Sequence, residues 1–271
     1  MSPGPSIYDS PRLAAKYAGD RPPVHPHIIR AIGAHLHLTT RVARALDIGC
    51  GAGLSTAALE PLAESLVGIE PVRVMLTHCH AVAPHARFLV AQAEALPFPA
   101  GAFDLMTAAG SLNYADLGLF LPEAERVLTA RGVLAIYDFS AGRRLRGNRL
   151  LEVWFAAFER RYPSPPDYDL DVRGLAYGAA GLCLEAYEEL EVAVPMSREA
   201  YVSYALGETN VEAAIGRGMP EAAIAAWCDR TLAPVFGDVA RDVIFECYVA
   251  HVTKGLGAHA SPDPPHREAE T

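Results

Sequence analysis

Short apolar runs alternate with segments of helical spacing along residues 42–139. Each run has the length of a β-strand and is bounded by glycine, proline or an acidic residue. The five predicted strands are Val42–Ile48, Ser65–Glu70, Arg87–Ala91, Phe103–Ala108 and Val133–Asp138. Helices fit between them at Leu54–Ala63, Val72–Ala83 and Leu117–Leu128. Nearly continuous apolar strands that alternate with helices are typical of a parallel sheet covered on both faces, so the pattern predicts a doubly wound α/β sheet.

The segments on either side add helices and two more strands. Upstream, Pro11–Tyr17 and His27–Leu38 have helical spacing, and prolines between them interrupt the helix. Downstream, an amphipathic helix is predicted at Asn148–Arg161. Its apolar face consists of Leu150, Leu151, Trp154, Phe155 and Phe158. The remaining predicted elements are a strand at Glu188–Val194, helices at Arg198–Leu206 and Glu221–Phe236, and a last strand at Asp242–Thr253.

These elements predict a single domain over residues 1–254 with a seven-stranded sheet. Its predicted parts are an N-terminal helical lid (1–38), a core (42–140), a helical cap inserted after the fifth strand and containing the sixth (141–238), and the last strand (242–254). The tail at 255–271 is rich in proline, alanine, histidine and charge, and we expect it to be disordered.

Composition and charge narrow the classes of function. The 271 residues carry a formal net charge of -9, which disfavours a nucleic-acid partner because such partners are bound through clustered lysine and arginine. No apolar run approaches the roughly 20 residues that cross a bilayer, and the N-terminus lacks the apolar stretch of a secretory signal. Five scattered cysteines without a CxxC pair indicate no disulfide framework. We therefore expect a cytoplasmic protein that binds a small molecule and neither nucleic acid nor membrane.

A glycine-rich loop lies between the first predicted strand and the first predicted helix. Residues 46–56 read LDIGCGAGLST, with glycines at 49, 51 and 53. The dinucleotide fingerprint requires glycine where Leu54 stands, and no Gly-Lys-Ser/Thr follows, so both a nicotinamide cofactor and a P-loop are disfavoured. The glycines let a ligand approach the main chain, and the following helix offers N–H groups to an anion. With Asp47 before the turn, the loop suits a ligand that has both an amino and a carboxylate group.

Two further segments suit a nucleoside. Glu70 ends the second predicted strand, where a carboxylate can accept hydrogen bonds from the hydroxyls of a ribose. Gln92 and its neighbours follow the third strand and offer amide and backbone groups to an adenine edge. Met75 lies in the helix after Glu70 and could pack on the ring.

Taken together, these residues resemble the class I S-adenosylmethionine-dependent methyltransferases. The resemblance is closest to the small-molecule branch that includes the ubiquinone and trans-aconitate methyltransferases. The matching segments are LDIGCGAG (46–53), GIEP (68–71), AEALPFP (93–99), FDLMTAAGSLNY (103–114) and RGVLAIYDFS (131–140), preceded by a similar leading helix with Tyr17 and Arg21-Pro22. The resemblance implies a Rossmann-like fold and S-adenosyl-L-methionine as cofactor over about residues 8–140, and it weakens beyond.

The family's cofactor contacts can be transferred to this sequence residue by residue. The resemblance implies that Tyr17 and Arg21 close over the methionine carboxylate and that Ala109 and Gly110 form the floor near the sulfonium. Gln92 stands where the family often has an acidic residue. The full set of implied cofactor-binding residues is Tyr17, Arg21, Asp47, Gly49, Gly51, Gly53, Glu70, Pro71, Met75, Gln92, Ala93, Glu94, Ala109 and Gly110.

The catalytic groups are less well marked. A sulfonium is already an activated methyl donor, so positioning supplies much of the rate, and a base is needed only if the acceptor must lose a proton. The candidate catalytic residues are His25, Asn113 and Asp138. No metal site is predicted, because His78 and His80 are two residues apart on a predicted helix and face different sides.

The sequence therefore predicts methyl transfer to an O, N or C atom of a small, partly apolar metabolite. Two alternatives stay open: a methyltransferase fold that uses the bound cofactor without methyl transfer, as a cyclase or isomerase would, and a cofactor-binding regulatory domain. Formation of S-adenosylhomocysteine in proportion to product separates the first from methyl transfer. The sequence makes no prediction of the acceptor's identity or of the oligomeric state.

Overall fold

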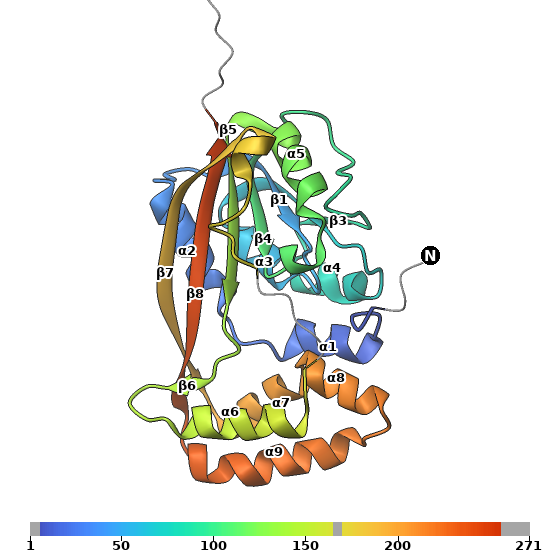
Figure 1. The fold of residues 1–271 in the computed structure, drawn as a ribbon, viewed down its shortest axis with the longest axis vertical. Coiled ribbons are helices and arrows are strands. Elements are labelled where there is room, and N and C mark those ends of the chain that lie inside the picture. Colours follow the sequence, from blue (N-terminus) through green and yellow to red (C-terminus); the bar gives the residue numbers. More distant parts are fainter. Residues whose placement is uncertain (1–5, 165–169, 256–271) are drawn as a thin grey trace, which may run out of the picture.

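The computed structural model describes residues 6–164 and 170–255. Its centre is one mixed sheet in the order β3-β2-β1-β4-β5-β8, with β6 and β7 both paired to β8 (Figure 1). The strands are β1 (Val42–Ile48), β2 (Ala63–Ile69), β3 (Arg87–Leu89), β4 (Phe103–Ala109), β5 (Leu128–Phe139), β6 (Arg144–Leu145), β7 (Leu182–Met196) and β8 (Arg241–Lys254). The first five are parallel, and β8 runs antiparallel to β5 and β7. This confirms the predicted doubly wound α/β sheet, with the two-residue β6 as an addition.

The helices cover both faces of the sheet and one of its ends. They are α1 (Pro11–Gly19), α2 (His25–His35), α3 (Leu54–Leu59), α4 (Cys79–Val82), α5 (Leu117–Val127), α6 (Leu150–Arg161), α7 (Arg198–Leu206), α8 (Thr209–Gly216) and α9 (Glu221–Phe236), with 3-10 turns η1 (Met75–His78), η2 (Leu112–Tyr114) and η3 (Tyr177–Ala180). Helices α2 and α3 pack on one face, and α5 and η3 on the other. In the described residues, no helix is both long and apolar enough to span a membrane.

Alternating burial along the strands explains why the sheet has two apolar faces. Ala135 and Val249 face the helices α2 and α3, whereas Leu134 and Ala250 face α5. Side chains alternate along a strand, so each central strand supplies residues to both layers. The sheet is therefore buried on both sides, and polar groups are accessible mainly where its strands end.

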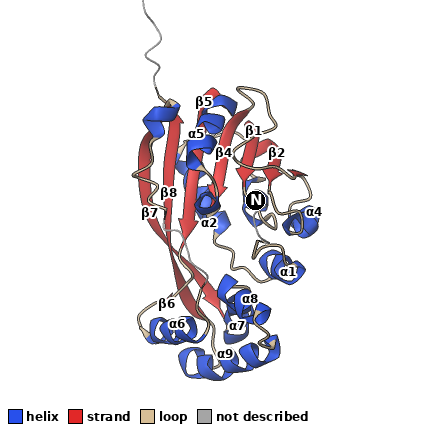
Figure 2. Cartoon of the chain, turned by 45° about the vertical axis from the view of Figure 1, so that its right-hand side comes forward, coloured by secondary structure: helices blue, strands red, loops and turns tan. Residues whose placement is uncertain are grey.

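Helices α6–α9, which we call the helical layer, lie beyond one end of the sheet (Figures 1 and 2). They pack around an aromatic cluster in which Trp154 stacks on Phe158 and contacts Tyr201 and Trp227. The indole N–H of Trp154 donates to Thr231 Oγ1 at 2.8 Å, so its buried polar group is satisfied. Strands β7 and β8 run from the sheet into this layer, and helices α7–α9 are inserted between them.

Several predicted boundaries need correction. The segment predicted as one helix at Val72–Ala83 is the 3-10 turn η1 followed by the single-turn α4. The helix predicted at Leu54–Ala63 ends at Leu59, because Ala63 already begins β2. Leu150 was predicted on the apolar face of this helix, but at the start of α6 its side chain is 52% exposed. Helix α8 was not predicted, and the predicted disordered tail lies outside the described residues except for Gly255.

Candidate functional site

A cavity of about 280 Å³ lies at the carboxyl ends of β1, β4 and β5. On the core side it is bounded by the glycine loop at 49–52, by Ala109 and Gly110 at the end of β4, and by residues 138–141 at the end of β5. The opposite side is built by residues of the α1–α2 region and by the junction of α7 and α8. Ligands of open α/β sheets bind at this edge, so the cavity is the candidate active site.

The glycine loop needs glycine for two separate reasons. Gly49, Gly51 and Gly53 have φ of 64°, 53° and 94°, a left-handed backbone that other residues rarely adopt. At Gly49 an added Cβ would also lie 2.4 Å from Ser111 Cβ. Ser111 Oγ in turn donates to the carbonyl of Ile48 at 2.7 Å. The loop is thus pressed against the segment after β4, and its main chain forms the cavity wall.

Asp47 lies beneath the loop rather than on the cavity wall. Its carboxylate accepts hydrogen bonds from Ser55 Oγ at 2.6 Å, Thr56 Oγ1 at 2.7 Å and Thr107 Oγ1 at 2.9 Å, and it is fully buried. Burial raises the pKa of this carboxyl, while the three hydroxyl donors act to lower it. Asp47 therefore joins β1, the start of α3 and β4, and so holds the loop between them.

Glu70 and its neighbours lie beside the cavity. Glu70 Oε2 accepts from the Gly51 N–H at 3.1 Å and Oε1 from the Val72 N–H at 2.9 Å. Burial raises the pKa of this carboxyl, and the two backbone donors oppose the rise. Met75 is buried against Ala52, and Pro71 is exposed. The carboxylate thus links the glycine loop to the end of β2 but does not line the cavity.

The residues predicted around an adenine are separated from the cavity. Gln92 is exposed, and Ala93 packs on the α5 side of the core. Glu94 Oε1 accepts from the Asp116 N–H at 2.8 Å. Residues 92–94 therefore lie near η2 and do not line the cavity.

Arg21 brings a buried positive charge to the cavity wall. Its guanidinium lies over the rings of Tyr17, at 4.0 Å, and Tyr204, at 5.3 Å. It donates to Glu208 Oε1 at 2.6 Å and to the Gly207 carbonyl at 3.2 Å. Its Nε is buried and has no hydrogen-bond partner among the described residues. The geometry leaves one charged donor of Arg21 for a ligand.

His25 is the titratable candidate with the clearest environment. Its Nδ1 lies 3.0 Å from Tyr137 Oη, and its ring meets those of Tyr137 and Phe139 edge to face. Burial, together with the charge of Arg21, lowers the pKa of His25 to about 4. The imidazole is therefore neutral at pH 7 and has the form that can accept a proton.

Asp138 and Asn113 complete the predicted catalytic set on the cavity wall. Asp138 is the penultimate residue of β5 and lies next to Gly110, where an added Cβ would come within 2.8 Å of Asp138 Oδ1. Its Oδ1 accepts from the Phe139 N–H at 2.8 Å. Asn113 lies in η2. The structure thus brings His25, Asn113 and Asp138 to one cavity.

Comparison with known proteins identifies the fold around this cavity. Residues 46–136 match the methyltransferase domain family. The Geotalea uraniireducens ubiquinone/menaquinone biosynthesis C-methyltransferase UbiE is 36% identical over 110 residues, which are 37% of this chain and 47% of that protein. A candidate type II methyltransferase of Anaeromyxobacter dehalogenans superposes with a TM-score of 0.61 over 86% of this chain and 97% of that one, at 21% identity. Residues 46–136 are therefore a methyltransferase domain, and the chain shares its fold with the solved methyltransferase.

The match to this methyltransferase family is strongest in the core. The Bacillus subtilis methyltransferase YcgJ, of uncharacterized activity, is 31% identical over 104 residues, which are 36% of this chain and 41% of that protein. The chain spans about half the length of the first curated relatives that it matches. The helical layer lies outside the matched family region.

This methyltransferase family implies S-adenosylmethionine, and the cavity fits such a ligand. The unpartnered Nε of Arg21 suits a carboxylate, and the open space at Gly51, where an added Cβ would meet only Met75 Cε at 3.6 Å, suits close approach to the main chain. Tyr17 and the floor residues Ala109 and Gly110 also line the cavity. The side chains of Asp47, Glu70, Met75 and residues 92–94 support or flank it instead.

Sequence reasoning missed several residues of the cavity, among them Tyr8, Tyr204 and Glu208. Tyr8 Oη and Tyr114 Oη lie 2.9 Å apart, and the Tyr8 ring meets Tyr17 edge to face. Burial raises the pKa of Tyr8 and of Tyr204, so both phenols stay protonated at neutral pH. Tyr114 belongs to the quoted segment after β4, but no motif marks Tyr204 or Glu208.

Proposed function

We propose that this protein transfers a methyl group from S-adenosylmethionine to an O, N or C atom of a small, partly apolar molecule. The observation that carries the proposal is the meeting of the glycine loop with Arg21 and His25 in one cavity. The loop supplies main-chain contacts, Arg21 supplies a charge and His25 supplies a neutral base. Rings of Tyr8, Tyr17 and Tyr204 make the opposite wall aromatic.

The cofactor supplies an electrophilic methyl group on a sulfonium when it is bound. The main chain at Gly49 and Gly51 would hold its methionine part, and Arg21 Nε would donate to its carboxylate. Glu70 would accept from the ribose hydroxyls, and residues 92–94 would border the adenine.

The acceptor would be bound between the core and the tyrosine wall. When Nδ1–H of His25 donates to Tyr137 Oη, the lone pair is on Nε2, and this nitrogen can take a proton from a hydroxyl or an acidic carbon. Tyr137 is fully buried, which raises the pKa of its phenol and keeps it protonated. Asn113 and Asp138 would orient polar groups of the acceptor. Exclusion of water by the aromatic wall would strengthen these interactions.

The first experiment is a calorimetric titration of the full chain with S-adenosylmethionine, followed by an acceptor screen that quantifies S-adenosylhomocysteine. Demethylated quinols are the first acceptors to try, because the name of the UbiE relative refers to quinone biosynthesis. We expect micromolar binding and S-adenosylhomocysteine in an amount equal to that of the methylated product. Product without S-adenosylhomocysteine would support the cyclase or isomerase alternative, binding without turnover on any acceptor would support a regulatory domain, and absence of binding would overturn the proposal.

A further inference from the structure

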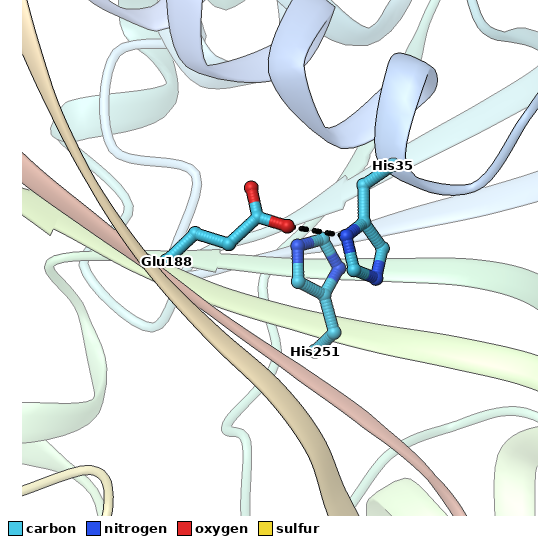
Figure 3. Close-up of side chains that lie close together, drawn as sticks. All are labelled: His35, Glu188 and His251. Carbon is cyan, nitrogen blue, oxygen red and sulfur yellow. Dashed lines mark hydrogen bonds and ion pairs between the residues drawn. The ribbon is translucent and has the colours of Figure 1, made fainter.

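Three potential metal ligands from distant parts of the sequence meet on the α2 side of the sheet. His35 ends α2, Glu188 lies in β7 and His251 lies in β8 (Figure 3). One ligand atom from each residue lies within 4.8 Å of the other two. None of the three is among the described residues that line the cavity, and α2 separates His35 from His25 by ten residues, or about 15 Å.

His251 is a buried histidine whose ring nitrogens lack hydrogen-bond partners within the described part of the chain. Its side chain is 2% exposed, and neither ring nitrogen has a hydrogen-bond partner among the described residues. Burying an imidazole without a partner is unfavourable, and a buried polar group in this state calls for a water or an ion. The partners of His251 in the sheet are Ala135 and Ala186, which offer no side-chain donor or acceptor. The polar side chains of His35 and Glu188 lie beside it.

The other two residues lie directly beside His251. The His35 ring stacks on the His251 ring at 3.7 Å between centroids and 12° between planes. Nδ1 of His35 also pairs with Glu188 Oε1, as Figure 3 shows. This pair satisfies His35 and Glu188 but leaves His251 without a partner. A positive ion between the three groups would satisfy all of them.

The donor set favours a particular class of ion. Two imidazole nitrogens and one carboxylate oxygen are ligands of zinc and of other first-row transition metals, whereas calcium and magnesium take oxygen ligands. Zinc bonds of about 2.0 to 2.2 Å place tetrahedral ligand atoms about 3.4 Å apart, so the stacked imidazole rings must rotate out of their parallel arrangement for the three atoms to converge on one ion. The side chains of His35 and Glu188 are 29% and 42% exposed, which provides a route from solvent.

We propose that His35, Glu188 and His251 form a binding site for a divalent transition metal ion such as zinc. The ion would be held on the covered face of the sheet and would join the end of α2 to the β7–β8 pair. With three protein ligands, its remaining coordination is completed by water. The site is separate from the proposed methyl transfer, and its existence does not depend on that activity.

Calorimetry with zinc chloride on the tag-free full chain tests the proposal directly. The background carries Cys183→Ser, because Cys183 is an exposed thiol in β7 that could bind zinc by itself. We expect one zinc per chain with a dissociation constant in the micromolar range or below, and no comparable binding of magnesium. Cobalt chloride should give the visible absorption bands of a cobalt ion bound by nitrogen and oxygen.

Two variants remove ligands in different ways, and two serve as controls. Glu188→Gln keeps the shape of the side chain but removes its charge, and His251→Leu replaces the unsatisfied imidazole with an apolar group. We expect zinc to bind at least tenfold more weakly to each. Glu189→Gln changes the next residue of β7, whose side chain borders a separate hollow, and His27→Gln changes an exposed histidine of α2. Both controls should bind zinc like the parent chain.

A second readout protects the test against variants that fail to fold. One equivalent of zinc should raise the melting temperature of the parent and control chains and leave that of folded Glu188→Gln unchanged. Zinc binding that is equal in parent, Glu188→Gln and His251→Leu would overturn the proposal. So would the absence of any zinc binding by the parent chain, or magnesium binding as tight as that of zinc.

Discussion

The two sides of the cavity are built in different ways. The core side is mainly backbone: the glycine loop and Gly110, supported from below by Asp47. The opposite side consists of long side chains from α1, α2 and the helical layer, with Arg21 at its centre. A cavity wall made of backbone requires glycine at a few fixed positions. A wall made of side chains can be formed by many different residues. We therefore expect changes on the core side to affect cofactor binding most and changes on the opposite side to affect it less.

The largest effect is expected for Gly49→Ala. The φ of 64° strains alanine, and its Cβ would lie 2.4 Å from Ser111 Cβ. We expect a loss of about 3 kcal/mol in unfolding free energy and at least a tenfold weaker affinity for S-adenosylmethionine, measured by denaturation and calorimetry. Gly101→Ala is the matched control, because Gly101 has the same φ and no atom within 4 Å of the added Cβ. Equal losses in the two variants would contradict the assignment of a packed loop.

Arg21→Gln should have the next largest effect. Removal of the charged donor should weaken S-adenosylmethionine binding by about tenfold or more, the order of a hydrogen bond to a charged group. Arg12→Gln is the control, because Arg12 also joins α1 to the helical layer, through Glu212 and Glu221, but does not line the cavity. We expect its binding constant to stay within about twofold of the parent value. Similar weakening in both variants would mean that Arg21 acts only by holding the lid.

His25 should make the protein sensitive to acid. Its pKa of about 4 in the folded state lies below the ordinary value of 6.5, so the unfolded chain binds more protons between these pH values. The stability that depends on neutral His25 is present above pH 6.5 and is lost as the pH falls towards 4. We expect His25→Asn to remove about 1 to 2 kcal/mol of the parent's stability change between pH 7 and pH 4.5, measured by urea denaturation. Parallel stability curves for parent and variant would contradict the lowered pKa.

Tyr8→Phe should have the smallest effect. It removes the contact between Tyr8 Oη and Tyr114 Oη and keeps both rings. We expect a loss of about 0.5 to 1 kcal/mol in unfolding free energy, measured by denaturation. Tyr114→Phe removes the same contact, so the double variant should lose no more than either single one. Additive losses would show that the two hydroxyls act independently.

The sequence predicts the core better than the periphery for a physical reason. Strand β1 and the loop at Gly49 are specified by neighbouring residues, because apolar strands and glycines at fixed spacing act locally. The helices α7 and α9 are predicted with their observed bounds, since their periodicity is clear. The extent of β2, in contrast, depends on pairing with β1, and the single-turn α4 lies in a segment that was predicted as a longer helix.

Contacts between distant residues escape sequence reasoning altogether. Glu208 meets Arg21 across 187 positions, and Glu188 meets His35 across 153. No spacing rule connects such residues, because the fold alone brings them together. Asp47 shows the reverse case: the sequence marks it, but only the structure shows that it faces three hydroxyls rather than the cavity. The roles of these residues in catalysis and cofactor binding stay predictions until the variants are measured.

The pairing of β7 with β8 has a consequence for engineering the acceptor site. Met196 and Arg241 are partners in the sheet, so the segment that forms α7–α9 leaves the sheet and returns to it at the same place. A short turn, or the corresponding helices of a related enzyme, could replace this insertion without changing the strand pairing above it. Tyr204 and Glu208 would be exchanged together with the insertion, while the glycine loop would stay in place. The fold thus offers a natural crossover point for chimaeras, in which Arg21 would meet new partners in place of Tyr204 and Glu208.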